Sequence, residues 1–199
     1  WRGAMTLPRE FALKTIGGEP TLFVTPAAAF DAWADGRPAV HEGDLSVESA
    51  TRALSAATRG VVQRITVTIE PRRAARAGVI VRGSADGAIG TRIVYDTAKR
   101  TLTLDRSRSG ATDFAGNFSR EHIVDLPLEN GRVQLEIVVD RGSVEVFANG
   151  GRVALTDLIF PPREADRVAV FAEHGSATFS GLTVTQLDAG HARDDCASR

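Results

Sequence analysis

The chain has 199 residues, of which 43% are hydrophobic and 25% charged, and its formal net charge is −1. This length fits one large domain or two small ones, and the hydrophobic share is sufficient to fill a core. The nearly neutral charge gives no support to a nucleic-acid partner or an anionic membrane surface, and no stretch is apolar over the length needed to span a bilayer.

The N-terminal part of the chain is expected to contain two short strands and one short helix. Residues 1–7 are expected to be the tail end of something that precedes the domain, or a linker from it. The strands are predicted at 10–16 and 21–24. The helix is predicted over residues 26–33, PAAAFDAW, because Pro26 suits a first helical turn and Gly36 suits a stop.

Strand periodicity dominates the rest of the chain. Ile65, Val67 and Ile69 alternate with polar residues, a pattern that buries one face of a strand and wets the other. Further runs of this kind lie at 77–82, 91–95, 101–105, 122–126, 132–140, 167–172 and 177–187. About a dozen strands at this spacing predict an all-β fold, namely an antiparallel β-sandwich of two sheets of the jelly-roll or concanavalin-like type.

Turn residues favour the same topology. Residues 140–143 (DRGS) separate two alternating runs, and residues 149–151 (NGG) follow the second run, so two successive hairpins are predicted. No low-complexity linker divides the chain. One sandwich domain is therefore predicted over residues 8–187, followed by a disordered tail over 188–199. That tail holds the single cysteine, Cys196, which excludes an internal disulfide framework and a thiolate zinc site of the usual kind.

The sequence offers no recognisable catalytic constellation. It contains none of the G-x-S-x-G, H-E-x-x-H or G-x-x-x-x-G-K motifs. Residues 41–44 (HEGD) could be imagined as metal ligands, but a solvated turn is the better interpretation. Asp105, Asp140 and Glu145 are interpreted as strand-edge, turn or surface residues, and no pair of them is predicted to be catalytic. No catalytic residue, metal site or cofactor is predicted.

Sugar binding by a sandwich normally uses exposed aromatic rings, and this chain has few candidates. Most of its nine phenylalanines are in phase with the predicted core. Trp33 and Tyr95 are the two aromatic residues of the sandwich that are candidates for carbohydrate binding. A stand-alone sugar-binding module would be expected to contain more Trp and Tyr, so a structural role ranks higher.

Three segments carry a resemblance to a known family. They are residues 1–10 (WRGAMTLPRE), residues 95–110 (YDTAKRTLTLDRSRSG) and residues 139–151 (VDRGSVEVFANGG), with TDLIFPP following at 156–162. In this order they resemble the domain boundary and the C-terminal domain of glycoside hydrolase family 32, which comprises invertases, inulinases and levanases. The resemblance implies a β-sandwich that follows a five-bladed β-propeller, and the propeller holds the active site.

The resemblance also implies what this chain lacks. The catalytic blocks of the family, Asn-Asp-Pro-Asn-Gly, Arg-Asp-Pro and Glu-Cys, do not occur in the sequence. The chain alone is therefore expected to be inactive. The parent would be a retaining β-fructosidase, most similar to a levanase, exo-inulinase or sucrose hydrolase, and the resemblance is compatible with a secreted bacterial enzyme. The expected partner is the catalytic propeller of the same enzyme, with Trp1, Arg2 and Arg9 as interdomain contacts. Fructan or sucrose would be bound by the parent enzyme.

Three alternatives remain open at this point. The chain could be an independent carbohydrate-binding module, an oligomerisation domain that pairs whole enzymes through a sheet edge, or a self-sufficient glycosidase. Binding of fructan, the oligomeric state of the parent and release of fructose would distinguish them.

Overall fold

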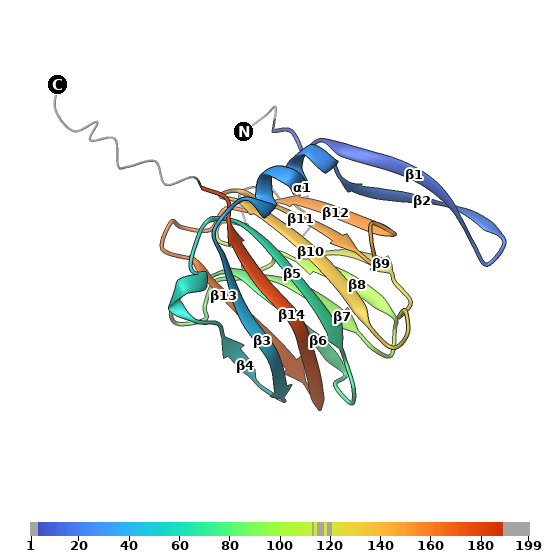
Figure 1. Cartoon of the computed structure of the whole chain (residues 1–199). Coiled ribbons are helices and arrows are strands. Elements are labelled where there is room, and N and C mark those ends of the chain that lie inside the picture. The colour runs from blue at the N-terminus through green and yellow to red at the C-terminus, as the bar shows by residue number, and fades with distance from the viewer. Residues whose placement is uncertain (1–3, 113, 115–117, 119–120, 189–199) are drawn as a thin grey trace, which may run out of the picture.

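The computed structural model describes residues 4–112, 114, 118 and 121–188. Within these residues it contains fourteen strands, one α-helix and one short 3₁₀ turn (Figure 1). The helix is α1 (Ala28–Asp35), and the 3₁₀ turn is η1 (Ala56–Thr58). The strands are β1 (Arg9–Ile16), β2 (Glu19–Pro26), β3 (Ala39–Glu48), β4 (Thr51–Ala53), β5 (Val62–Glu70), β6 (Arg76–Gly83), β7 (Thr91–Asp96), β8 (Thr101–Asp105), β9 (Glu121–Asp125), β10 (Val133–Asp140), β11 (Ser143–Ala148), β12 (Val153–Leu158), β13 (Arg167–Glu173) and β14 (Ser176–Gln186).

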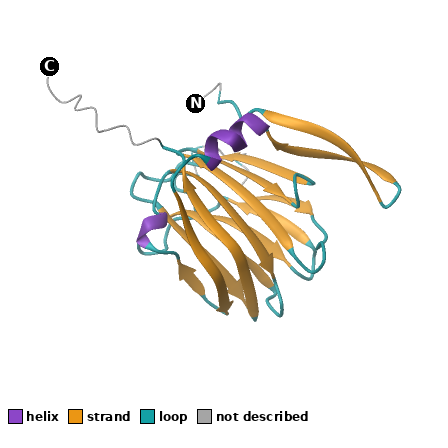
Figure 2. Ribbon diagram, viewed as in Figure 1, coloured by secondary structure: helices purple, strands orange, loops and turns teal. Residues whose placement is uncertain are grey.

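Twelve of these strands form two antiparallel six-stranded sheets that face each other (Figure 2). Sheet I has the order β12-β11-β10-β5-β14-β3, and sheet II has the order β4-β13-β6-β7-β8-β9. The predicted antiparallel β-sandwich of two sheets is confirmed. No helix in the described ranges is long and apolar enough to cross a membrane.

The core lies between the two sheets and follows the period-two pattern of the sequence. In β5 the side chains of Ile65, Val67 and Ile69 are buried, while the intervening polar side chains face outward. Sheet II contributes buried side chains such as Ile93 and Leu102 from the opposite side. Alternation therefore fixes which face of each strand is internal, because a slip of one residue would expose the whole apolar set.

Both predicted hairpins of the second half are present. Residues 140–143 join β10 to β11, and the NGG turn joins β11 to β12. Arg141 and Asn149 adopt left-handed φ values of 46° and 48°, and Gly150 and Gly151 follow at 64° and 90°. Turns that match the twist of an antiparallel pair require such positive φ values, which accounts for the asparagine and glycines here.

The prediction of a solvated turn at residues 41–44 is wrong, since these residues lie within β3. The strand was not recognised because its pairing with β14 shifts register near Leu182 and Gly43, which interrupts the regular alternation. Gly43 has a φ of 70° at that irregularity. β4, which has three residues, was also not predicted.

The first two strands form a separate two-stranded sheet, which we call the N-terminal hairpin. It projects beyond the sandwich, and α1 lies between it and β3 along the chain (Figure 1). The strands of the two large sheets run from Ala39 to Gln186, whereas the sandwich domain was expected from residue 8. The predicted N-terminal linker (1–7) lies partly outside the described residues, and the predicted disordered tail (188–199) lies almost entirely outside them.

Candidate functional site

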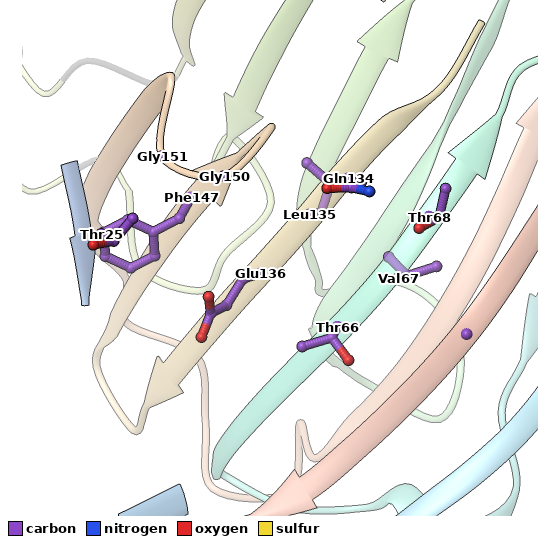
Figure 3. A pocket seen from close by; sticks show the side chains of 11 residues that line it. Thr25, Thr66, Val67, Thr68, Gln134, Leu135, Glu136, Phe147, Gly150 and Gly151 are labelled. Atoms are coloured by element: carbon purple, nitrogen blue, oxygen red, sulfur yellow. The ribbon is translucent and has the colours of Figure 1, made fainter. Parts of the chain in front are cut away.

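A groove of about 340 Å³ opens on the outer face of sheet I, beside the base of the N-terminal hairpin (Figure 3). We call it the outer groove. It is lined by Thr25, Thr66, Val67, Thr68, Gln134, Leu135, Glu136, Phe147, Gly150, Gly151 and Gly181. Hydroxyl, amide and carboxylate groups are thus gathered on the outer face of one sheet.

Strand register explains why the polar side chains of the outer groove lie together. β5 and β10 are antiparallel neighbours, and their register pairs Thr66 with Glu136 and Thr68 with Gln134. Residues two apart on a strand share a face, so the two pairs stand side by side on the outer surface. The turn between β11 and β12 and the end of β2 supply the facing wall, where glycines leave the backbone uncovered.

Glu136 is held by Arg64, which also ties α1 to the sheet. The Arg64 guanidinium lies 2.7 Å from Glu136, 3.2 Å from Asp31 and 2.9 Å from Asp35. Burial raises the pKa of the Glu136 carboxyl, and the positive charge of Arg64 opposes that shift. One arginine thus joins two residues of α1 to a strand of sheet I.

Apolar packing joins α1 to the same face of sheet I. Ala34 of the helix is buried with Val138 and Leu187, and Phe30 packs against this small cluster. The helix is only eight residues long, and a helix of that length is marginal in isolation. Its position therefore depends on this contact and on Arg64.

A second set of contacts holds the N-terminal hairpin, and we call it the clamp: Arg9, Glu145, Thr156, Phe147 and Gly151. Glu145 points outward from β11 and is only 4% exposed. Its carboxylate accepts the backbone N–H of Leu7 at 2.7 Å and forms an ion pair with Arg9, whose guanidinium also donates to the Thr156 hydroxyl.

Two further contacts complete the clamp. The Arg9 guanidinium lies 5.4 Å from the centroid of the Phe147 ring, within the range of a cation–π interaction. The backbone N–H of Val24 donates to the carbonyl of Gly151 at 2.8 Å. Both strands of the hairpin are thus attached to β11 or to the residues that follow it.

The interpretation of Glu145 as a surface residue is wrong, because the N-terminal segment covers it. Its outward phase in β11 was visible in the sequence, but the covering segment lies 136 residues earlier and left no local signal. Arg9 was predicted to be an interdomain contact. The structure shows that its guanidinium contacts the sandwich of the same chain, and a contact of Arg9 with another domain stays a prediction. Trp1 and Arg2 lie outside the described residues.

The two candidate sugar-binding residues are far from equivalent. Tyr95 is fully buried in the core, and its hydroxyl donates to the carbonyl of Leu126 at 3.1 Å. Its ring cannot stack on a sugar, so this candidate is corrected to a core residue. Trp33 on α1 is 42% exposed, with the Arg37 guanidinium 4.5 Å from its ring centroid. Neither residue lines the outer groove.

The side chains of the outer groove suit contact with a ligand better than cleavage of a glycosidic bond. Glycoside hydrolysis normally needs two carboxyl groups that face each other across the scissile bond. Among the described residues that line the groove, Glu136 is the one carboxylate, and Arg64 occupies it. The neighbouring carboxylate of Glu145 forms an ion pair with Arg9. Within the described ranges, no group of three or more His, Cys, Asp or Glu residues could hold a metal ion.

Comparisons with known proteins agree on one family. Residues 34–186 match the family described as "Glycosyl hydrolases family 32 C terminal". The extracellular exo-inulinase of Aspergillus awamori is 34% identical over 167 residues, which make up 83% of this chain and 31% of that protein. The levanase of Bacillus subtilis is 30% identical over 190 residues, which make up 94% of this chain and 28% of that protein.

Solved structures give the same result. The crystal structure of the exo-inulinase from Aspergillus awamori superposes with a TM-score of 0.78 at 31% identity, covering 94% of this chain and 36% of that one. A fructosyltransferase from A. japonicus has a TM-score of 0.72 at 21% identity, covers 88% of this chain and 31% of that one, and supports the fold alone. The chain therefore spans about a third of the length of the exo-inulinase and of the Bacillus subtilis levanase.

Proposed function

Because the chain belongs to glycoside hydrolase family 32, as its C-terminal domain, we propose that it is the non-catalytic sandwich of a fructan- or sucrose-hydrolysing enzyme. It stabilises the catalytic domain that precedes it in that enzyme and shapes the approach of substrate. The relatives are named exo-inulinase and levanase, which supports a substrate with fructosyl bonds. The parent cleaves these bonds by a retaining double displacement, with both carboxylates supplied by the catalytic domain.

The clamp is the observation that carries this proposal. A buried carboxylate is costly unless it is paired, and Glu145 is paired entirely with the N-terminal segment. This pairing fixes the direction in which the chain enters the sandwich. A catalytic domain attached to that segment is held in one orientation and not on a flexible tether.

The outer groove supports the second part of the proposal. It lies beside the clamp on the outer face of sheet I (Figure 3). A catalytic domain that is attached at the start of the N-terminal hairpin would lie close to this polar face of sheet I. The hydroxyls of Thr66 and Thr68 and the amide of Gln134 suit contact with the hydroxyls of a sugar chain.

The proposal is tested by removing the sandwich from the complete enzyme. Deletion of residues 8–187, the N-terminal hairpin and the sandwich together, is expected to lower the midpoint of thermal unfolding of the catalytic domain by several degrees, because the interdomain contact is lost. The fraction that remains folded should keep a kcat for sucrose within about threefold of the intact value, since no reacting group is removed. An unchanged unfolding midpoint would exclude a stabilising role.

A further inference from the structure

The open edge of β1 is the feature from which we draw a further inference. β1 pairs with β2 along its whole length, including Phe11 with Val24 and Leu13 with Leu22. The N–H of Val24 points away from β1, to Gly151, so the Phe11–Val24 pair is a non-hydrogen-bonded one. Hydrogen-bonded and non-hydrogen-bonded pairs alternate along an antiparallel ladder. The Ala27 N–H donates to the Pro8 carbonyl at 2.9 Å, so this pair, three residues from the Phe11–Val24 pair, is a hydrogen-bonded one, as the alternation requires.

It follows that the residues of β1 alternate in where their backbone groups point. Even-numbered residues such as Ala12 and Lys14 hydrogen-bond to β2. Odd-numbered residues, Phe11, Leu13 and Thr15, direct their N–H and C=O groups to the other side of the strand. Within the described part of the chain, β1 pairs with no strand on that side.

The same odd-numbered residues place an apolar face beside this open edge. Phe11, Leu13 and the facing Leu22 are 69%, 72% and 53% exposed. On the opposite face of the hairpin, Phe23 is buried, with the Lys14 ammonium 4.1 Å from its ring centroid. Of the eight large hydrophobic side chains exposed in the described ranges, four belong to this hairpin. Three of these four, Phe11, Leu13 and Leu22, share one face of the hairpin, and Ile16, which is 38% exposed, lies on the other.

β1 has neither a proline nor a bulge along its open edge. Solvent-exposed edges carry inward charges, prolines or bulges that discourage further strand pairing. The register of β1 with β2 has no shift over eight pairs, and Lys14 lies on the face opposite Phe11 and Leu13, over the Phe23 ring. A regular edge with exposed phenylalanine and leucine is a template for another strand.

We propose that β1 joins a β-sheet of the catalytic domain through this open edge, with Phe11, Leu13 and Leu22 buried against that domain. The inference rests on the proposed function and specifies how the two domains are joined. About two thirds of the length of the relatives lies outside the part that this chain matches, which provides the partner. A partner in the same polypeptide is present at high effective concentration, so it covers the edge before a second copy can.

Residue-resolved hydrogen exchange tests strand addition directly. In the 199-residue chain, the amides of Ala12 and Lys14 should be protected, and those of Phe11, Leu13 and Thr15 should exchange freely. In the complete enzyme, the three odd-numbered amides should become protected by a factor of about ten or more. Free exchange of these amides in the complete enzyme would overturn the proposal.

A matched pair of substitutions tests the apolar face. Leu13 lies on the same face as Phe11 and Leu22, and Ile16 lies on the other face of the same strand, so Leu13→Lys and Ile16→Lys form the pair. Leu13→Lys should lower the unfolding midpoint of the complete enzyme by several degrees and leave that of the 199-residue chain unchanged. Ile16→Lys should have a clearly smaller effect on the complete enzyme. Equal effects of the two substitutions there would contradict burial of the odd face.

The outcomes also separate this inference from the proposed function. If deletion of the sandwich lowers the unfolding midpoint but the odd-numbered amides remain unprotected, strand addition is wrong and the stabilising role stands. If neither change is seen, both are wrong. Protection of these amides in the isolated chain that grows with protein concentration would identify a second copy as the occupant and overturn the proposal.

Discussion

Glu145→Ala is expected to detach the N-terminal hairpin from sheet I while the sandwich stays folded. The substitution leaves Arg9 without its carboxylate partner and the Leu7 N–H without its acceptor. Breaking a mostly buried ion pair by removing one partner costs about 3 kcal/mol or more. A two-stranded hairpin is marginal without further packing, so detachment also frays β1 and β2.

Hydrogen exchange at Val24 measures this effect, because its amide reports the contact with Gly151. The free energy of opening at Val24 should fall by about 3 kcal/mol. The amide of Ile65, in the centre of the core, should keep its protection. A double variant, Arg9→Met with Glu145→Leu, should recover part of the loss, because no buried charge is left unpaired. Equal loss of protection at Val24 and Ile65 would show that Glu145 supports the whole sandwich and not the clamp.

Gly151→Ala is expected to have a similar effect through shape alone. Gly151 has a φ of 90°, and a Cβ at this position would lie 2.4 Å from the carbonyl oxygen of Val24. Left-handed backbone costs a residue with a Cβ about 1 to 2 kcal/mol. The overlap with β2 adds to that cost, for a total of about 3 kcal/mol.

Gly150→Ala is the matched control. Gly150 also has a positive φ, of 64°, but a Cβ there would meet no atom within 4 Å. It should therefore show only the backbone cost of about 1 to 2 kcal/mol and leave the Val24 amide protected. Chemical unfolding gives the stability of each variant, and exchange at Val24 gives the state of the hairpin. If Gly150→Ala releases Val24 as strongly as Gly151→Ala, close contact with β2 is not what Gly151 provides.

The sandwich could be predicted from the sequence because the patterns that indicate its strands and turns involve residues close together in the chain. Alternation in β5 and β10, and the DRGS and NGG turns, each follow from residues that are neighbours in the chain. β3 was missed where local pattern and tertiary structure disagree, at the irregular pairing around Gly43. Packing against β14 holds β3 in place there, and the pattern of β3 alone does not show it.

The candidate site could not be predicted in the same way, because it joins distant segments. Glu145 is an ordinary acidic residue in its own strand, and only Leu7 and Arg9, more than 130 residues earlier, give it a partner. Tyr95 was chosen as a candidate for sugar contact because the sandwich has few Trp or Tyr residues and most of its phenylalanines are in phase with the core. The register of β7 with β8 pairs Tyr95 with Leu102 on the internal face.

This chain is proposed to serve a fructan- or sucrose-hydrolysing enzyme without a reaction of its own. Release of fructose by the purified 199-residue chain, with sucrose, inulin and levan as substrates and the complete enzyme as positive control, tests that claim most directly. The predicted result is no release above the buffer control for any of the three. Release that follows the chain through purification would contradict the account and make the chain a self-sufficient glycosidase.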